Sequence, residues 1–591
     1  MALLVRWRLE APSPSQPWRA GPLPLPGKRG TEPRPRHTSP WGEVEIAQRF
    51  RVRGRAGFSV LRSHLFSAAL LLAAALLAPL APAIAATPAD TLVVAKNIDD
   101  IVSLDPAQAY EFTSGEIVTN TYDRLVQYEA EDMQKLVGGL AESWTVSDDG
   151  KTLVFKLRPG VTFQSGNKLR PEDVVFSLAR TVKLNKAPAF LLTQLGWTPD
   201  NVEQMVRKTG DAEVTVTTTG GFAPSFVLNV LASRPASVVD EETVTAHAKD
   251  GDLGNAWLGQ NSAGTGPFSL RSYKPNESIA LRANPSYFRG APAMKSVIYR
   301  HVAEPATQRL LLEAGDADLA RDLTPDQVAA LEGKDGITIG TYPQAAVHFF
   351  ALNQKVEALR NPKLWEAVRY LVDYDGMTRS FLRGQMKVHQ AFWPEGFPGA
   401  LNDTPYTLDI AKAKALLAEA GVKPGLTIKM DVISSPPFTE IAQSLQSTFA
   451  QAGITLDLVP GTGSQVITKY RARNHEAVLL YWGPDFMDPH SNAGAFAYNV
   501  DNSDGSPQST TTWRNSWLVP ELSAETEAAL KERDAAKRDA MYVDLQRKVQ
   551  ESSPIVIMFQ AVSQVAMRSA VHGYANGATT DQIYYRLVTK Q

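Results

Sequence analysis

Cysteine is absent from all 591 residues of the chain. Its absence excludes disulfide bonds, thiolate zinc sites, iron–sulfur sites and a cysteine nucleophile. A chain without thiols also suits an oxidising compartment, where stray cysteines would pair wrongly. Hydrophobic residues make up 44% and charged residues 21% of the chain, which excludes a fibrous or wholly disordered protein.

The chain also lacks a strong excess of one charge. It has 62 acidic and 60 basic residues. Segment 1–85 holds 12 basic and 4 acidic residues, which leaves the remaining 506 residues with a net charge of −10. Binding of nucleic acid needs clustered Lys and Arg to neutralise phosphates. We therefore expect no nucleic-acid partner.

Catalytic and cofactor motifs are missing as well. The chain has no His-Glu-x-x-His, no Gly-x-Ser-x-Gly and no Gly-x4-Gly-Lys-Ser/Thr motif. The run Gly264-Thr265-Gly266-Pro267 lacks the third glycine of a dinucleotide loop and precedes a predicted strand, so we interpret it as a tight turn. The sequence thus predicts a protein that is not an enzyme and holds no cofactor.

Two short segments carry groups that bind metals in other proteins. Asp488-Pro489-His490 supplies two ligands, whereas a transition-metal site needs three or four in fixed geometry. Glu129, Glu131 and Asp132 suit either a hard cation or a solvated turn. The turn is the simpler interpretation, and we expect no metal site.

Only one long apolar run is present, from Leu65 to Ala86. Four arginines between residues 51 and 62 precede it, and Ala83-Ile84-Ala85 closes it, as in a secretory signal peptide. A membrane anchor is the alternative, because about 20 apolar residues span a bilayer. Two prolines and the small-x-small site favour cleavage. We expect 1–85 to be a leader and the mature protein to begin at Ala86.

The leader predicts the compartment in which the protein works. No cysteine follows the apolar run, so lipid attachment is excluded, and no Arg-Arg pair precedes it as in a twin-arginine signal. An exported chain without a lipid anchor is expected in the periplasm. The first fifty residues are long for a signal peptide, which suggests a true translation start near Val52.

From residue 90 onward the chain alternates short strands with amphipathic helices, and its length suits three to four domains at about 150 residues each. The predicted strands are 92–95, 152–157, 426–432, 454–458 and 477–481, and the predicted helices begin at Pro171 and Pro362 and span 408–420 and 438–452. Strand–helix alternation over 361–482 indicates an α/β fold with a parallel sheet covered on both faces.

One segment is far more specific than these patterns. Residues 141–180 read AESWTVSDDGKTLVFKLRPGVTFQSGNKLRPEDVVFSLAR. They resemble the signature of the family 5 solute-binding proteins, which serve ATP-binding-cassette importers of dipeptides, oligopeptides and nickel. Further blocks follow in the family's order, ending with Trp482-Gly483-Pro484-Asp485-Phe486-x-Asp488-Pro489. The resemblance covers essentially all of 90–591.

The resemblance implies a two-lobed periplasmic-binding-protein fold of class II, of the large type with an extra subdomain, and a ligand cleft between the lobes. By analogy, lobe I comprises 86–130, 262–345 and 555–591, the extra subdomain comprises 131–261, and lobe II comprises 346–554. It also implies a monomer that takes a peptide or peptide-like solute to the membrane permease of an importer.

The resemblance also points to residues that hold the ligand. In peptide-binding members an Asp of the Trp-x-x-Asp block receives the ligand's α-amino group, and this position is Asp485 here. Its neighbours Tyr481 and Trp482 are further candidates, as are Tyr110 and Glu111 in the first loop. The alternatives are a turn role for Asp485, beside Pro484, and core packing for the aromatic residues.

One departure leaves the ligand open. Some dipeptide binders hold the ligand carboxylate with an Arg from the loop before the predicted helix 438–452, but that loop reads Ser434-Ser435-Pro436-Pro437 here. Carboxylate capture then requires another Arg. Longer peptides, opines, glutathione, metal chelates and sugars all remain open. A periplasmic hydrolase and a nickel-chelate or haem receptor are the rival functions.

Overall fold

The computed structural model describes residues 87–130, 132–506, 510–577, 579 and 582–591. The chain divides into two compact units, Met1–Ala81 and Pro82–Gln591, and every described residue belongs to the second. The predicted leader and the predicted start at Ala86 lie outside the described residues. Within the described part, no helix combines the length and apolar character that crossing a membrane requires.

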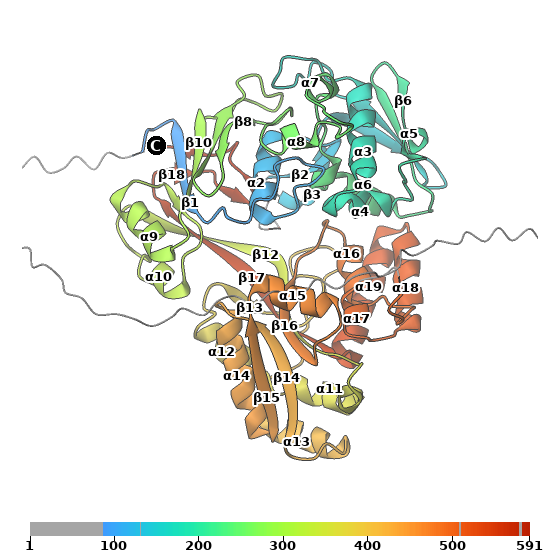
Figure 1. Cartoon of the computed structure of the whole chain (residues 1–591), viewed down its shortest axis with the longest axis vertical. Helices are drawn as coiled ribbons and strands as arrows, with labels where there is room; N and C mark the ends of the chain where they lie inside the picture. The colour runs from blue at the N-terminus through green and yellow to red at the C-terminus, as the bar shows by residue number, and fades with distance from the viewer. Residues whose placement is uncertain (1–86, 131, 507–509, 578, 580–581) are drawn as a thin grey trace, which may run out of the picture. The chain divides into compact units, whose positions relative to one another are not determined.

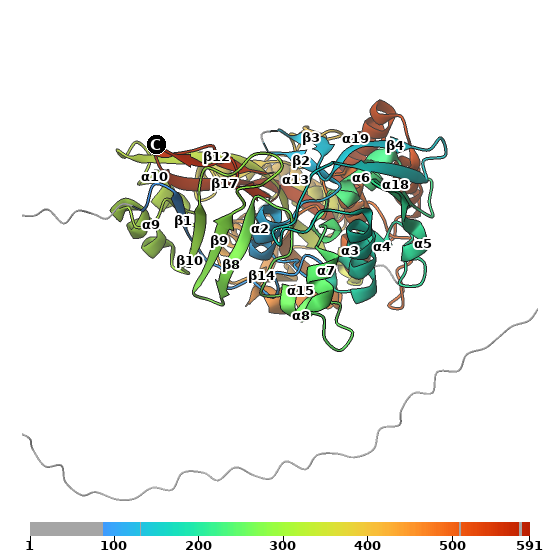
Figure 2. The same ribbon diagram turned by 90° about the horizontal axis from the view of Figure 1, so that it is seen from above.

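One large mixed sheet forms the framework of the described chain (Figure 1). Its described strands, in spatial order, are β15 (Ile454–Gly461), β14 (Leu426–Ile433), β16 (Ala477–Trp482), β12 (Ile337–Leu352), β17 (Ile555–Arg568), β11 (Leu319–Ala320), β1 (Thr91–Lys96), β10 (Ser296–His301), β9 (Ser278–Ala283) and β8 (Phe268–Lys274), with β13 (Met386–Val388) also paired to β17. Figure 2 shows β8, β9 and β10 side by side at one end.

The predicted parallel sheet is confirmed only in part. Strand β14 runs parallel to both β15 and β16, as the strand–helix alternation indicated. However, β12 pairs antiparallel with β16 and with β17, so the sheet as a whole is mixed. No strand was predicted from the sequence over the range of β12.

The two long strands β12 and β17 join the two ends of the sheet. Their pairing runs from Ile337 opposite Arg568 to Ala351 opposite Ile555 and is interrupted between Pro343 and Val347. The short stretch 344–346 therefore leaves the regular ladder. A bulge of this kind bends the strand and turns its side chains away from the pairing direction.

A separate four-stranded sheet lies within the range expected to form the extra subdomain. Its strands, in order, are β4 (Ala141–Val146), β5 (Thr152–Leu157), β7 (Glu213–Thr217) and β6 (Val206–Gly210). The predicted strand 152–157 is confirmed as β5, and a hairpin turn at Asp149-Gly150 joins it to β4; Gly150 has a φ of +71°, which glycine adopts without strain. The lobe and subdomain boundaries themselves stay a prediction.

Helices begin where the sequence places helix-starting residues. Helix α3 (Pro171–Leu184) opens with Pro171, and Asp173 accepts a hydrogen bond from the Arg170 backbone. Helix α11 (Pro362–Arg369) is capped by the Asn361 side chain. The predicted helices 408–420 and 438–452 are α13 (Ile410–Glu419) and α14 (Phe438–Gln451).

The remaining elements are short strand pairs and helices around the two sheets. The strand pairs are β2 (Val126–Glu129) with β3 (Asp132–Gly138), β18 (Val571–His572) with β21 (Thr589–Lys590), and β19 (Ala575–Asn576) with β20 (Ile583–Tyr584). The remaining helices are α2 (Phe112–Thr121), α4 (Phe190–Thr193), α5 (Val202–Met205), α6 (Pro224–Leu231), α7 (Glu241–Ala246), α8 (Asn255–Leu258), α9 (Pro305–Ala314), α10 (Pro325–Ala329), α12 (Tyr374–Arg379), α15 (Gly463–Arg471), α16 (Pro489–Phe496), α17 (Thr511–Arg514), α18 (Pro520–Lys531) and α19 (Ala535–Ser552).

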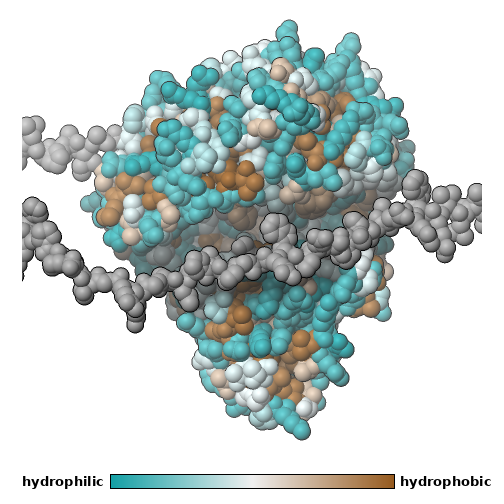
Figure 3. Space-filling model, in the orientation of Figure 1, coloured by the Kyte–Doolittle hydropathy of each residue, from teal (hydrophilic) through white to brown (hydrophobic). Residues whose placement is uncertain are grey.

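Apolar residues are buried along both kinds of element. Residues Ala477, Val478, Leu479 and Leu480 of β16 are all buried, which confirms a strand covered on both faces. Helix α14 turns Ile441, Leu445 and Phe449 toward the core it shares with β14 and β15. On the face in Figure 3 hydrophobic side chains are scattered among hydrophilic ones, as on most protein surfaces.

Candidate functional site

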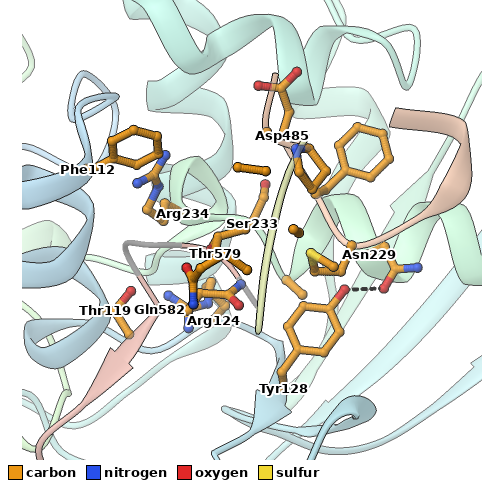
Figure 4. A pocket seen from close by; sticks show the side chains of 18 of the residues that line it. Phe112, Thr119, Arg124, Tyr128, Asn229, Ser233, Arg234, Asp485, Thr579 and Gln582 are labelled. Carbon is orange, nitrogen blue, oxygen red and sulfur yellow. Dashed lines mark hydrogen bonds between the residues drawn. The ribbon is translucent and has the colours of Figure 1, made fainter. Parts of the chain in front are cut away.

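A cavity of about 180 Å³ collects side chains from segments that lie far apart in the sequence (Figure 4). It is lined by Tyr110, Phe112, Thr119, Arg124, Tyr128, Asn229, Ala232, Ser233, Arg234, Gln344, Ala345, Ala346, Gly483, Pro484, Asp485, Phe486, Met487, Thr579, Gln582 and Tyr584. Small-molecule sites are usually concave, largely apolar and furnished with a few convergent polar groups. This cavity has that character, with one carboxylate and two guanidinium groups on its wall.

Asp485 reaches the cavity because β16 ends just before it. The strand stops at Trp482, and Gly483 and Pro484 turn the chain so that Asp485 joins the lining. The Tyr110 hydroxyl donates a 2.8 Å hydrogen bond to Asp485 Oδ1, and the Asp485 backbone N–H donates to Ser491 Oγ at 2.9 Å. Two residues 375 positions apart are thus joined across the cavity wall.

Burial controls the protonation of this pair. It raises the pKa of the Asp485 carboxyl above the ordinary range, and the Tyr110 hydrogen bond and two nearby arginines oppose that rise. Burial likewise raises the pKa of the Tyr110 phenol, and the Asp485 charge raises it further. Tyr110 therefore stays a neutral donor, and Asp485 is a half-buried acceptor that gains from a cationic partner.

A buried ion pair holds the loop that carries Asp485. Asp488 accepts hydrogen bonds from Arg538 Nη1 and Nη2 at 2.9 and 2.7 Å, and both side chains are almost fully buried. Asp488 also accepts from the His490 backbone N–H and so caps α16. The ion pair thus attaches the loop that follows Asp485 to helix α19.

The Asp488–His490 segment therefore has a structural role. Both Asp488 oxygens are engaged by Arg538, and the His490 ring lies against Phe226 and near the Tyr542 hydroxyl. Burial lowers the pKa of His490 to about 4. Across the described ranges, no three His, Cys, Asp or Glu side chains are grouped closely enough to hold a metal ion.

The predicted acidic cluster is also engaged in part. Glu129 accepts two hydrogen bonds from Arg289 Nη2, at 3.1 and 3.0 Å, at the turn between β2 and β3. The turn interpretation fits this ion pair, whereas Glu131 lies outside the described residues.

Three of the predicted ligand-binding residues lie outside the cavity lining. Tyr481 is 37% exposed and packs against His348 and Phe438. The Trp482 indole donates to Asn492 Oδ1 at 3.2 Å. Glu111 accepts from the Tyr110 backbone N–H, at the turn that starts α2. The structure thus brings Asp485 and Tyr110 together but not these three, and all five binding roles stay predictions.

Sequence reasoning missed the two guanidinium groups of the cavity. Arg124 lies between α2 and β2, and Arg234 lies in the turn after α6. Arg234 Nη2 points to the Tyr110 carbonyl oxygen at 3.5 Å. Neither position belongs to a motif quoted from the sequence, and only the tertiary structure places both on one cavity.

Comparison with known proteins identifies the family. The model of the bacterial extracellular solute-binding proteins, family 5, matches residues 135–504. The chain belongs to this family. It is thus a solute-binding protein of the importer type, from a family of binding proteins and not of enzymes.

Individual relatives agree with the family assignment. The chain is 29% identical over 504 residues to the probable D,D-dipeptide-binding periplasmic protein DdpA of Escherichia coli K12, covering 85% of this chain and 94% of DdpA. The solved structures include DppA of Helicobacter pylori in complex with peptide STSA, with a TM-score of 0.70 and 23% identity, covering 85% of this chain and 98% of that one. A dipeptide-binding protein of Pseudoalteromonas in complex with Met-Leu has a TM-score of 0.71 and 21% identity, covering 85% and 100%.

These likenesses confirm the predicted α/β periplasmic-binding-protein fold, with the correction that its sheet is mixed. In this family member the loop Ser434–Pro437 ends at the start of α14, and none of its residues is among the described cavity lining. The loop therefore has no Arg and does not reach the cavity. The guanidinium groups in the described cavity lining are those of Arg124 and Arg234.

Proposed function

We propose that the protein is a periplasmic receptor that captures a short peptide or peptide-like solute in the cavity beside Asp485. It then delivers the solute to the membrane permease of an ATP-binding-cassette importer. The observation that carries the proposal is the half-buried Asp485 carboxylate, which accepts a hydrogen bond from Tyr110 on the cavity wall. Membership of a solute-binding family supports it.

The chemistry of Asp485 favours a ligand ammonium group. Tyr110 donates to Oδ1, so one oxygen of the carboxylate already accepts a neutral hydrogen bond. An α-amino group adds a charge-assisted bond of about 1.5–3 kcal/mol. The ammonium group also lowers the Asp485 pKa that burial raises, because a nearby cation favours the charged form of the acid.

The names of relatives support a peptide-like ligand. A 29% identical relative is described as D,D-dipeptide-binding, and a 25% identical protein of Escherichia coli is described as dipeptide-binding. The cavity of about 180 Å³ is below the roughly 300–1,000 Å³ typical of sites for drug-sized molecules. A short ligand therefore suits it better than a long chain.

Mass spectrometry of material that co-purifies with gently isolated protein tests the proposal. We expect peptide or amino-acid-derived masses, and calorimetry with a panel of di- and tripeptides should give one-to-one binding without hydrolysis. Cleavage of the panel would instead indicate the rival hydrolase. Nickel or haem retained through purification, with no peptide binding, would indicate the rival receptor.

A further inference from the structure

Arg124 is a buried cation, two of whose guanidinium nitrogens have no hydrogen-bond partner among the described residues. Only 5% of the residue is exposed, and within the described chain its Nε and Nη1 atoms have no hydrogen-bond partner. Buried donors are nearly always paired, so an unpaired guanidinium on a cavity wall is unusual. By contrast, the buried guanidinium of Arg369 donates to three backbone carbonyl oxygens, of Gln550, Trp365 and Ser553.

The neighbouring acid does not neutralise Arg124. Burial raises the pKa of Asp123, and its carboxylate accepts hydrogen bonds from the Thr265 hydroxyl and the Tyr287 hydroxyl. Among the described residues, Asp123 and Arg124 form no direct ion pair, although the Arg124 charge lowers the Asp123 pKa in part. The positive charge of Arg124 is thus left facing the cavity.

The charges of the cavity divide into two regions. Arg234 lies near Tyr110 and acts on Asp485, whose pKa its charge lowers in part. Arg124 lines the same cavity with Thr119 and Gln582, and Figure 4 shows it at the opposite end of the view from Asp485. Arg124 is thus separated from Asp485, the one carboxylate among the described lining residues.

We propose that Arg124 binds the carboxylate of the solute, so that the receptor selects a zwitterion held at both ends. The solute's ammonium group is then at Asp485 and its carboxylate at Arg124. A guanidinium presents a planar fork of donors that matches a carboxylate in a bidentate manner. This role rests on the proposed function, and it places the carboxylate contact on the segment between α2 and β2 rather than on Ser434–Pro437.

A ligand role and a structural role for Arg124 predict different behaviour of the ligand-free protein. If Arg124 waits for a ligand anion, then Arg124→Met removes an uncompensated buried charge and should leave the melting temperature unchanged or raised. If Arg124 supports the fold, the same change should lower it. Arg158→Met is the matched control, since Arg158 donates to the Gly139 carbonyl oxygen and lies outside the described cavity lining.

Calorimetry completes the test with named probes. The probes are the best-binding dipeptide of a full dipeptide panel, the same dipeptide as its C-terminal amide, and succinate as a carboxylate without an amine. We expect Arg124→Met to weaken the free acid by about thirtyfold to several thousandfold while the amide binds wild type and variant alike. Arg124→Lys should recover part of the loss, and Arg158→Met should bind as wild type does.

The outcomes separate this inference from the proposed function. Equal affinity of wild type and Arg124→Met for the free acid overturns the inference and leaves peptide binding intact. So does an equal loss for acid and amide together with a lowered melting temperature. If no dipeptide binds but succinate binds through Arg124, peptide capture fails and the anion site stands. If neither dipeptides nor succinate bind, the carboxylate role is overturned.

Discussion

The Asp485 carboxylate and the Tyr110 hydroxyl form the polar contact on which the proposed binding chemistry depends. Their hydrogen bond of 2.8 Å joins the loop after β16 to the segment before α2. Burial raises the pKa of both groups, so the protein holds a strong donor and a poorly solvated acceptor at one point. An environment of this kind is common where side chains are kept ready for a ligand.

Affinity for a ligand amine should depend on pH through Asp485. Because the folded-state pKa of Asp485 lies above the ordinary 3.8, the carboxyl keeps its proton to higher pH than in the unfolded chain. Its burial therefore costs stability as pH rises from 3.8 through the raised pKa. Ammonium binding needs the charged form, so affinity should rise over the same acid range and binding should release protons.

Calorimetry in two buffers of different ionisation enthalpy measures that proton release. The matched control is Glu241→Gln, because burial also raises the pKa of Glu241 and this residue is not part of the described cavity lining. This variant should keep the wild-type pH dependence, whereas Asp485→Asn should abolish it. Proton release that persists in Asp485→Asn would assign the titration to another group.

At the scale of single elements, the Asp488–Arg538 pair fixes the loop that presents Asp485. Arg538→Met leaves Asp488 charged and buried without its partner. Removing one partner of a buried pair costs about 3–5 kcal/mol of unfolding free energy at neutral pH. Urea unfolding measures this, with Lys274→Met as the control, because both Lys274 and Glu277 are largely exposed. Equal losses of unfolding free energy in the two variants would contradict an anchoring role for the Asp488–Arg538 pair.

How much the sequence predicted differs from element to element. Local signals sufficed for α3 and α11, because a proline at the first helical position and a cap next to it determine where a helix starts. The strands β14, β15 and β16 were predicted from apolar runs that follow the predicted helices 408–420 and 438–452. The antiparallel insertion of β12 beside β16 did not, since strand order is a tertiary property.

The cavity shows the same limit for single residues. Asp485 and Tyr110 were predicted by resemblance to a family, and the structure places both on the cavity wall. Tyr481 and Trp482 were predicted by proximity along the chain, but alternate side chains of a strand face opposite ways, and both pack elsewhere. Arg124 carried no sequence signal, because its unpaired state depends on what the fold leaves around it.

At the scale of the whole molecule, we expect a monomer that closes on its solute. The long paired strands β12 and β17 connect regions that are predicted to belong to different lobes, and the cavity lining includes residues from all three predicted parts. Ligand binding between lobes commonly shifts such a protein from open to closed states. Small-angle scattering should give a smaller radius of gyration with a saturating ligand. If the free protein is open, identical scattering curves with and without the ligand would contradict closure.

The predicted leader concerns the whole chain as well. Protein recovered from the periplasm should begin at Ala86, because the Ala83-Ile84-Ala85 site follows the apolar run. N-terminal sequencing of the mature protein measures this directly. Periplasmic material that begins upstream of Leu65 would contradict the signal-peptide interpretation.

The most direct test of the account compares one peptide and its N-acetylated form on wild type and Asp485→Asn. The substitution keeps the shape of the side chain and removes its charge. Loss of one partner of a buried pair should weaken the free-amine peptide by about a hundredfold to several-thousandfold. The melting temperature without ligand should stay unchanged or rise slightly, because burial disfavours the charge that the substitution removes.

Calorimetry measures these affinities, and the acetylated peptide is the decisive ligand. Without an ammonium group it should bind wild type and Asp485→Asn about equally, so that only the free-amine peptide distinguishes the two proteins. An equal loss of affinity for both forms of the peptide would contradict the account. It would leave Asp485 as a structural residue of the turn after β16.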